Sequence, residues 1–169
     1  AHGYREVGQE YLQNVLDTAK QLDAYDSGRI YYYLGEYQKA YLALDEARDK
    51  GGADSYLYLG RAYAATGDYN YASSVYNNYL SKQGPNAEIY NELGLCEMAK
   101  KEYQNALAAF QAGKQIEGNS LMQTLCFNEI VAYEYLEDYQ QAEVLMNAYL
   151  QNYPDDQAAI REQQFLSTR

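Results

Sequence analysis

Paired carboxylates are the residues of this sequence whose chemistry first suggests catalysis, because an acid and a base can share a proton-transfer step. Asp45-Glu46 and Asp155-Asp156 are adjacent pairs. Neighbouring side chains on a helix or in a turn diverge in direction, so we expect solvated charges and helix-end charges instead. The only histidine is His2. The sequence therefore predicts no Ser-His or Cys-His pair and no histidine-dependent zinc site.

The two cysteines, Cys96 and Cys126, are too few for a disulfide framework, and their spacing is unlike a zinc knuckle. Both fall in predicted helices, where we expect small, free, packed thiols. The alternative is a disulfide between neighbouring helices, which would imply an oxidising compartment. Phosphate-binding glycine loops, nucleophile elbows and calcium loops are also missing. We expect no catalytic residue, no metal site, no cofactor and no enzymatic activity.

Charge and hydropathy exclude further classes of partner. The 169 residues are 47% apolar and carry 24 acidic against 13 basic side chains, a net charge of −11, without a lysine- and arginine-rich run. Proteins bind nucleic acids and anionic membranes largely through clustered lysine and arginine side chains, so neither is an expected partner. No apolar run reaches the length needed for direct membrane insertion. The expected compartment is the cytoplasm or, if a leader was removed, a bacterial cell envelope.

A short pattern, an acidic residue followed by Tyr-x-x-Ala, occurs four times. The copies lie at Glu36–Ala40, Asp68–Ala72, Glu102–Ala106 and Asp138–Ala142, and their tyrosines are 32, 34 and 36 residues apart. A near-constant period of this size indicates an array of supersecondary units. The elements that position any site are therefore repeated, and their register decides which side chains share a face.

The segment Ala53–Asn86 shows one unit most clearly. Apolar and small residues recur at helical spacing, which predicts a helix that ends at Thr66-Gly67. A second apolar stripe starts at Tyr69, and Gly84-Pro85 ends it. Two such helices form an antiparallel hairpin, with small residues at Gly60 and Ala72 where the helices cross. A single hairpin leaves one apolar side exposed, so it must stack on another.

These residues resemble the tetratricopeptide repeat (TPR) family. The second unit carries the family's pattern of aromatic, Leu-Gly, aromatic, Gly-Asp-Tyr turn, small residue and aromatic at Tyr56, Leu59-Gly60, Tyr63, Gly67-Asp68-Tyr69, Ala72 and Tyr76. The third unit repeats it at Tyr90, Leu93-Gly94, Glu102-Tyr103, Ala106 and Phe110. The resemblance implies an all-α fold: a right-handed α-solenoid of four helix-turn-helix hairpins with flanking N- and C-terminal helices.

The implied boundaries are 21–52, 53–86, 87–120 and 121–156 for the four repeats, with an N-terminal helix in 1–20 and a C-terminal capping helix in 157–169. The first repeat has Ser27 in place of the leading leucine, and the fourth has Glu129-Ile130 in place of Leu-Gly. About two extra residues are expected near 118–120. Tyr4, Val7, Tyr11, Val15, Ala19 and Leu22 predict an amphipathic helix over 4–22 that packs on the first repeat.

The last helix is expected to run from a cap at Asp155 or Asp156 to about Leu166. In it, Ala159, Ile160 and Phe165 are predicted to cover the fourth repeat.

In the TPR family the first helix of each pair lines a groove that holds a peptide or a partner's helix. The groove residues that the resemblance implies here are Tyr25, Arg29, Tyr32, Tyr33, Tyr58, Arg61, Glu88, Asn91, Glu92, Leu95, Asn128 and Tyr135. Thr124, Phe127 and Glu134 also fall on this face. Arg29 and Arg61 occupy equivalent positions among tyrosines, which suits a carboxylate or an acidic or aromatic peptide.

The C-terminal part of the groove is acidic and partly apolar, which suits a basic or neutral-apolar ligand. An alternative is that the two arginines only pair with Asp26 and Asp54 and contribute little. The sequence thus predicts a non-enzymatic protein-protein interaction module that binds a protein or peptide partner. The alternative function is a structural scaffold or a self-assembling fragment of a longer TPR solenoid, favoured by the possible half repeat at the N-terminus.

Overall fold

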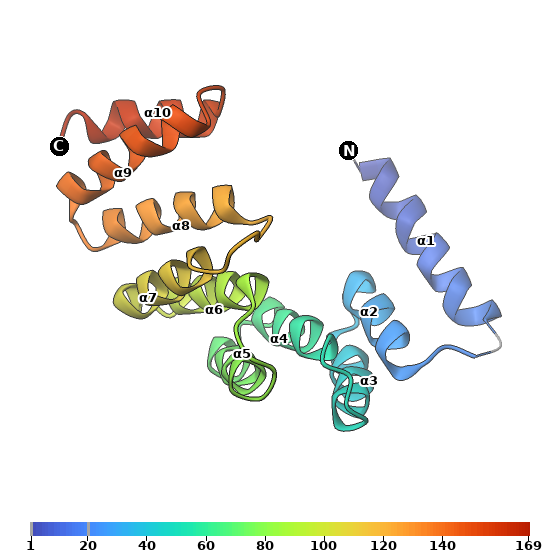
Figure 1. Cartoon of the computed structure of the whole chain (residues 1–169). Helices are drawn as coiled ribbons and strands as arrows, with labels where there is room; N and C mark the ends of the chain where they lie inside the picture. Colours follow the sequence, from blue (N-terminus) through green and yellow to red (C-terminus); the bar gives the residue numbers. More distant parts are fainter. Residues whose placement is uncertain (1, 20) are drawn as a thin grey trace. The chain divides into compact units, whose positions relative to one another are not determined.

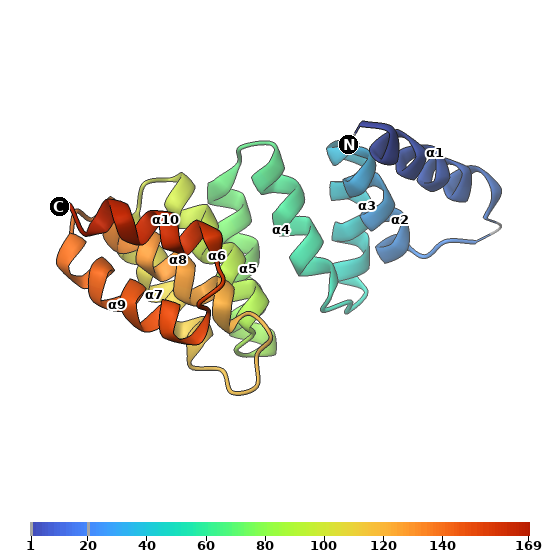
Figure 2. The same ribbon diagram turned by 90° about the horizontal axis from the view of Figure 1, so that it is seen from above.

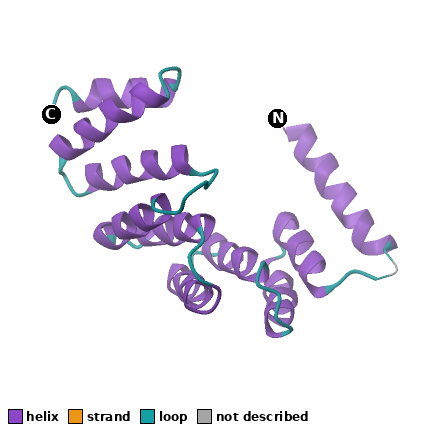
Figure 3. Ribbon diagram, in the orientation of Figure 1, coloured by secondary structure: helices purple, strands orange, loops and turns teal. Residues whose placement is uncertain are grey.

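The computed structural model describes residues 2–19 and 21–169, and in this part of the chain every regular element is an α-helix (Figure 3). The helices are α1 (His2–Thr18), α2 (Ala24–Leu34), α3 (Tyr37–Asp49), α4 (Ser55–Ala65), α5 (Tyr69–Gln83), α6 (Ala87–Ala99), α7 (Tyr103–Lys114), α8 (Met122–Tyr135), α9 (Tyr139–Asn152) and α10 (Gln157–Leu166). The predicted all-α class of the helical-repeat type is confirmed.

The chain divides into two compact units, Ala1–Gln83 with α1–α5 and Gly84–Arg169 with α6–α10 (Figure 1). Within the first unit, α2 packs on α3 and α4 on α5. Within the second, α6 packs on α7 and α8 on α9, and α10 follows against α9 (Figure 2). Consecutive helices therefore form the hairpins that the repeated motif predicts.

The turns inside the hairpins share one backbone conformation. Gly35 and Gly67 end α2 and α4 with φ values of 80° and 84°, in the left-handed region where glycine has no steric cost. Lys101 and Glu137 take the same place after α6 and α8, with φ values of 64° and 60°. The acidic-Tyr motif that follows therefore sets the turn even where the glycine is missing.

Close helix crossing in three hairpins depends on a glycine that faces a large side chain sixteen residues later. A Cβ added to Gly60 would lie 2.3 Å from the Tyr76 ring, and one added to Gly94 would lie 2.3 Å from the Phe110 ring. The atoms nearest to Gly60 are thus those of Tyr76, and Ala72, the other small residue predicted at the crossing, is fully buried. In α8 the corresponding residue is Ile130, which is buried in one cluster with Met146.

The N-terminal helix differs from its prediction over 4–22. It ends at Thr18, because Asp23 caps the next helix by accepting a hydrogen bond from the Asp26 backbone at 2.7 Å. Helix α1 packs on α2, and Val15 of the predicted stripe is half-buried. The prediction is wrong for Val7 and Tyr11, which are 66% and 67% exposed, and Leu12 and Leu16 are half-buried in their place. Ala1, Lys20 and the side chains of His2 and Tyr4 lie outside the described residues.

The C-terminal helix begins as predicted, because Asp156 accepts hydrogen bonds from the backbone of Ala158 and Ala159 at 3.0 and 3.2 Å. Ala159 is fully buried, but Phe165 is 40% exposed and Leu166 is the buried large residue at the end of the helix. The prediction for Phe165 is therefore wrong. Phe165 is instead covered by Arg169, whose Cζ atom lies 4.5 Å from the ring centroid.

The longer spacing before the fourth motif is taken up between α7 and α8, in residues 115–121. There Asn119 Nδ2 donates to the Ile116 carbonyl at 2.6 Å, and the Leu121 backbone N–H donates to Asn119 Oδ1 at 3.0 Å. Gly118 has a φ of 69°. The two expected extra residues are thus accommodated in a loop closed by an asparagine side chain.

Candidate functional site

Six predicted groove residues gather on α2 and α4, and we call them the arginine–tyrosine cluster: Tyr25, Arg29, Tyr32, Tyr33, Tyr58 and Arg61. The Arg29 Cζ atom lies 5.2 Å from the ring centroid of Tyr25 and 5.0 Å from that of Tyr58. Arg61 Cζ lies 5.6 Å from the same Tyr58 ring. Both guanidinium groups therefore rest on one aromatic side chain, at cation–π distances.

The tyrosines of this cluster hold one another in place around Tyr58. Its ring centroid lies 5.8 Å from Tyr32 and 6.0 Å from Tyr33, both in edge-on geometry. The Tyr33 and Tyr58 hydroxyls lie 3.2 Å apart, and this hydrogen bond, together with burial, raises the pKa of Tyr33. The Tyr33 phenol thus stays neutral at ordinary pH, and Tyr33 remains 52% exposed.

Arg29 also lies 3.7 Å from Asp26, so the predicted pairing with that carboxylate is present. The two side chains are 39% and 52% exposed, and ion pairs at such exposed positions contribute little to stability. The Nε–H of Arg29 is buried, and no acceptor reaches it from the part of the chain that the structure describes. Because the side chain as a whole is partly exposed, an incoming carboxylate could still pair with the guanidinium.

The other six predicted groove residues lie in the second unit, on α6 (Glu88, Asn91, Glu92, Leu95) and α8 (Asn128, Tyr135). Asn128 Nδ2 donates to Asn91 Oδ1 at 2.9 Å, which joins the two helices. Leu95 is 44% exposed and Tyr135 57%. Tyr135 stacks on Tyr103 of α7, with centroids 5.0 Å apart. This part of the predicted site is thus an amide bridge with apolar and acidic side chains around it.

A cavity of about 260 Å³ lies between α8 and α10, and we call it the α8–α10 pocket. It is lined by Gln123, Thr124, Phe127, Asn128, Tyr149, Asp156 and Ala158. The Tyr149 hydroxyl donates to Asp156 Oδ2 at 2.6 Å, and this hydrogen bond is the main cause that lowers the pKa of Asp156. Gln123 Nε2 donates to both groups, at 3.1 and 3.4 Å. The polar side of this pocket is therefore fixed by internal hydrogen bonds.

Farther along the same two helices, Glu134 of α8 faces Glu162 of α10. Burial, and then the Glu162 carboxylate, raise the pKa of Glu134 to about 7. Glu134 Oε1 is buried, and no donor reaches it among the described residues. Two ionised carboxylates cannot hydrogen-bond to each other, so this pair requires a shared proton or a cation. Sequence reasoning placed Glu134 on this face but missed Glu162, which is distant in sequence.

The raised pKa predicts that stability falls as pH rises. The Glu134 pKa is about 7 in the folded chain against 4.5 as the ordinary value, so the folded state binds the proton more tightly. The stabilisation is complete below the ordinary value and is lost as pH rises through the folded one. We expect the urea midpoint to drop between about pH 4.5 and about pH 7.5, and to drop less in Glu134→Gln. Equal pH dependence in both proteins would contradict this.

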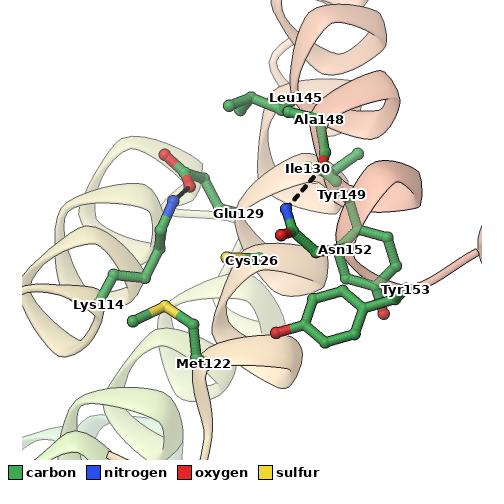
Figure 4. Close-up of a pocket in the computed structure, with 10 residues that line it drawn as sticks. All are labelled: Lys114, Met122, Cys126, Glu129, Ile130, Leu145, Ala148, Tyr149, Asn152 and Tyr153. Atoms are coloured by element: carbon green, nitrogen blue, oxygen red, sulfur yellow. Dashed lines mark hydrogen bonds and ion pairs between the residues drawn. The ribbon is translucent and has the colours of Figure 1, made fainter. Parts of the chain in front are cut away.

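A second cavity, of about 310 Å³, lies between α7, α8 and α9 (Figure 4). The Lys114 ammonium forms an ion pair with Glu129 in its wall, and Gln111 Nε2 donates to Glu129 Oε1 at 2.9 Å. Glu129 is only 5% exposed and occupies the position of the family's leucine. Sequence reasoning noted that departure but missed Lys114 as its partner, because the two helices meet only in the folded hairpin stack.

Both cysteines are free, as predicted. Burial raises the pKa of Cys96 to about 12. Burial also raises the pKa of Cys126, which lies in the wall of the second cavity, although Lys114 opposes the shift. Both thiols therefore stay protonated and poorly nucleophilic at ordinary pH.

No group of three or more His, Cys, Asp or Glu in the described part of the chain could hold a metal ion. None of the helices described here is long and apolar enough to cross a membrane.

Repeated helical hairpins with a shared turn define the class of the helical-repeat proteins. Residues 25–70 and 59–119 match the tetratricopeptide repeat family, which together is more than half of the chain. The chain belongs to this family. TPR proteins are generally non-enzymatic scaffolds that bind protein partners. The comparison with curated proteins gives no match.

Solved structures show the same fold at low sequence identity. The crystal structure of MamA matches with a TM-score of 0.74 and 19% identity, over 85% of this chain and 78% of MamA. TTC0263, a thermophilic TPR protein of Thermus thermophilus, matches with a TM-score of 0.74 and 16% identity, over 100% of this chain and 93% of its own. Cut9, from the APC/C hetero-tetramer Cut9-Hcn1, matches with a TM-score of 0.67 and 19% identity, over 97% of this chain and 33% of that one.

Proposed function

We propose that this chain is a non-enzymatic interaction module of four TPR repeats, with the boundaries that the sequence implies, whose first-helix faces bind a peptide or protein segment. The observation that carries the proposal is the arginine–tyrosine cluster. Two guanidinium groups lie over one tyrosine ring, and the Arg29 side chain is 39% exposed. Aromatic residues and arginine are enriched where proteins bind each other.

The chemistry of the cluster favours an acidic partner segment. Arginine binds carboxylates through parallel hydrogen bonds, and neighbouring tyrosine rings offer apolar edges to an aromatic side chain. The residues proposed to contact the partner in the first unit are Tyr25, Arg29, Tyr32, Tyr33, Tyr58 and Arg61. Those proposed in the second unit are Glu88, Asn91, Glu92, Leu95, Asn128 and Tyr135.

Replacing both arginines tests the function. We expect Arg29→Ala/Arg61→Ala to weaken partner binding by about tenfold or more, because central arginines contribute strongly at interfaces. The partner is first captured from native lysate, identified by mass spectrometry, and then purified and titrated against the full chain.

The matched control is Lys39→Ala/Lys50→Ala, which removes the same charge from two exposed positions of the first unit. Binding that falls equally in both variants would reflect net charge alone. Binding that is unchanged in the arginine variant would rule out the arginine–tyrosine cluster as the binding face.

The alternative is a scaffold that assembles with itself or continues a longer solenoid. The exposed Val7 and Tyr11 on α1 favour it, since a further helix could cover them. Light scattering on the full chain separates the two functions, because self-assembly requires a mass above that of one chain.

A further inference from the structure

The face between α8 and α10 combines an apolar hollow with a pair of neighbouring carboxyl groups. The α8–α10 pocket lies toward the starts of both helices, where Phe127 and Ala158 contribute to its wall. Glu134 and Glu162 face each other farther along the same helices. Val131, half-buried, lies between Phe127 and Glu134 on the same stripe of α8. The two features therefore share one strip of surface.

The pocket suits an apolar side chain, because its polar groups are already satisfied. Asp156 accepts hydrogen bonds from Tyr149, from Gln123 and from the start of α10. An apolar group that covers them does not leave a donor or acceptor unpaired, which is the main penalty for burying polar groups. The rings of Phe127 and Tyr149, with centroids 5.7 Å apart, offer the contact surface.

The carboxyl pair suits a cation. A lysine or arginine side chain beside this pair would relieve the repulsion between the Glu134 and Glu162 carboxylates. The surrounding charge favours the same ligand. Residues 84–169 carry 13 acidic and five basic side chains, a net charge of −8 of the chain's −11.

Helix geometry sets the spacing between the two features. Asn128 precedes Glu134 by six residues and Ala158 precedes Glu162 by four, so the features lie about 6–9 Å apart along the helices. An extended chain advances about 3.3 Å per residue. We propose that this strip binds an extended segment of a partner protein that carries an apolar side chain and, two positions away, a lysine or arginine, because side chains two positions apart lie on the same face of an extended chain.

This inference deepens the proposed function and rests on it, since it names the partner chemistry for the second unit. The probe is a fluorescein-labelled peptide with one leucine and one lysine two positions apart in a Gly-Ser background, titrated against the full chain. Companion peptides place the lysine six positions away or replace it by glutamate. We expect the two-position peptide to bind at least about fivefold more tightly than either companion.

Variants assign the binding to the strip. Ala158→Arg fills the pocket from an exposed position and should abolish binding, whereas the control Gln164→Arg, on an exposed position of the same helix, should not. The double variant Glu134→Gln/Glu162→Gln should weaken binding about fivefold. At pH values above 7 it should nevertheless have a higher urea midpoint than the starting chain, because it removes the repulsion between the two carboxylates. If the pair had only a structural role, the double variant would change the urea midpoint without weakening peptide binding.

The inference would be overturned if the probe did not bind, if all three peptides bound equally, or if Ala158→Arg left binding unchanged. A dimer of the full chain in light scattering that the unlabelled peptide dissociates would assign the strip to a second copy instead. Arg29→Ala/Arg61→Ala should leave probe binding unchanged. Failure of the probe, with partner binding that still depends on the two arginines, would remove this inference and leave the proposed function standing.

Discussion

Phe110→Ala should lower the free energy of unfolding by about 3–5 kcal/mol, the range for deleting a fully buried aromatic ring. Phe110 has no exposed surface and packs in one cluster with Leu125 and Ala106, which joins α7 to α8. Removing the ring leaves a cavity beside Gly94, which has no side chain that could fill it. Urea denaturation followed by circular dichroism measures the loss. Gln104→Ala, on an exposed position of the same helix, is the control and should change stability little.

A double-mutant cycle shows whether the glycine and the ring are coupled. Gly94→Ala alone should cost about 1–3 kcal/mol, because the new Cβ would lie 2.3 Å from the Phe110 ring. In the Phe110→Ala background the same methyl group enters the cavity, so its cost should nearly vanish. Additive losses would mean that the two side chains act independently and that the close crossing of α6 and α7 is not what requires Gly94.

Lys114→Met should lower the free energy of unfolding by about 3 kcal/mol, because it leaves the Glu129 carboxylate buried without its cation. We place the effect at the low end of the usual range, since Lys114 is 24% exposed and Gln111 still donates to Glu129. The surface control is Lys50→Met, which breaks an exposed ion pair with Glu46 and should cost less than about 0.5 kcal/mol. The measurement is the urea midpoint at constant pH.

Replacing both members of the pair should reverse the loss. Lys114→Met/Glu129→Leu restores the leucine that other repeats carry, and swaps of buried ion pairs for apolar side chains are often neutral or stabilising. We therefore expect the double variant to be at least as stable as the starting chain. A double variant as unstable as Lys114→Met would show that Glu129 is needed for packing as well as for charge.

The fold was largely predictable because its signals are local. The acidic-Tyr-x-x-Ala motif, the periodic apolar stripes and the glycine-bearing turns each act within one hairpin. The same local reasoning was wrong for α1, where several apolar residues compete for the buried face and only packing against α2 selects Leu12 and Leu16 over Val7 and Tyr11. It was wrong for Phe165 for the same reason, because Leu166 lies on the buried side of α10.

The candidate site was predictable in part. The period of the motif aligned Arg29 with Arg61, and the structure brings both onto Tyr58. The pairings of Glu129 with Lys114 and of Glu134 with Glu162 had no sequence signal, since each joins helices from different hairpins. Charge alone does not show which acidic side chains are solvated and which are buried against another helix.

The sequence by itself determined the repeating hairpin, its turns and the register that places side chains on the first-helix faces, because these follow from spacing along the chain. Only the tertiary structure decided which carboxylates are buried, which pockets open between helices and how their hydrogen bonds are satisfied. Those properties depend on distances between residues far apart in sequence, and burial changes the energy of a charge far more than sequence position does.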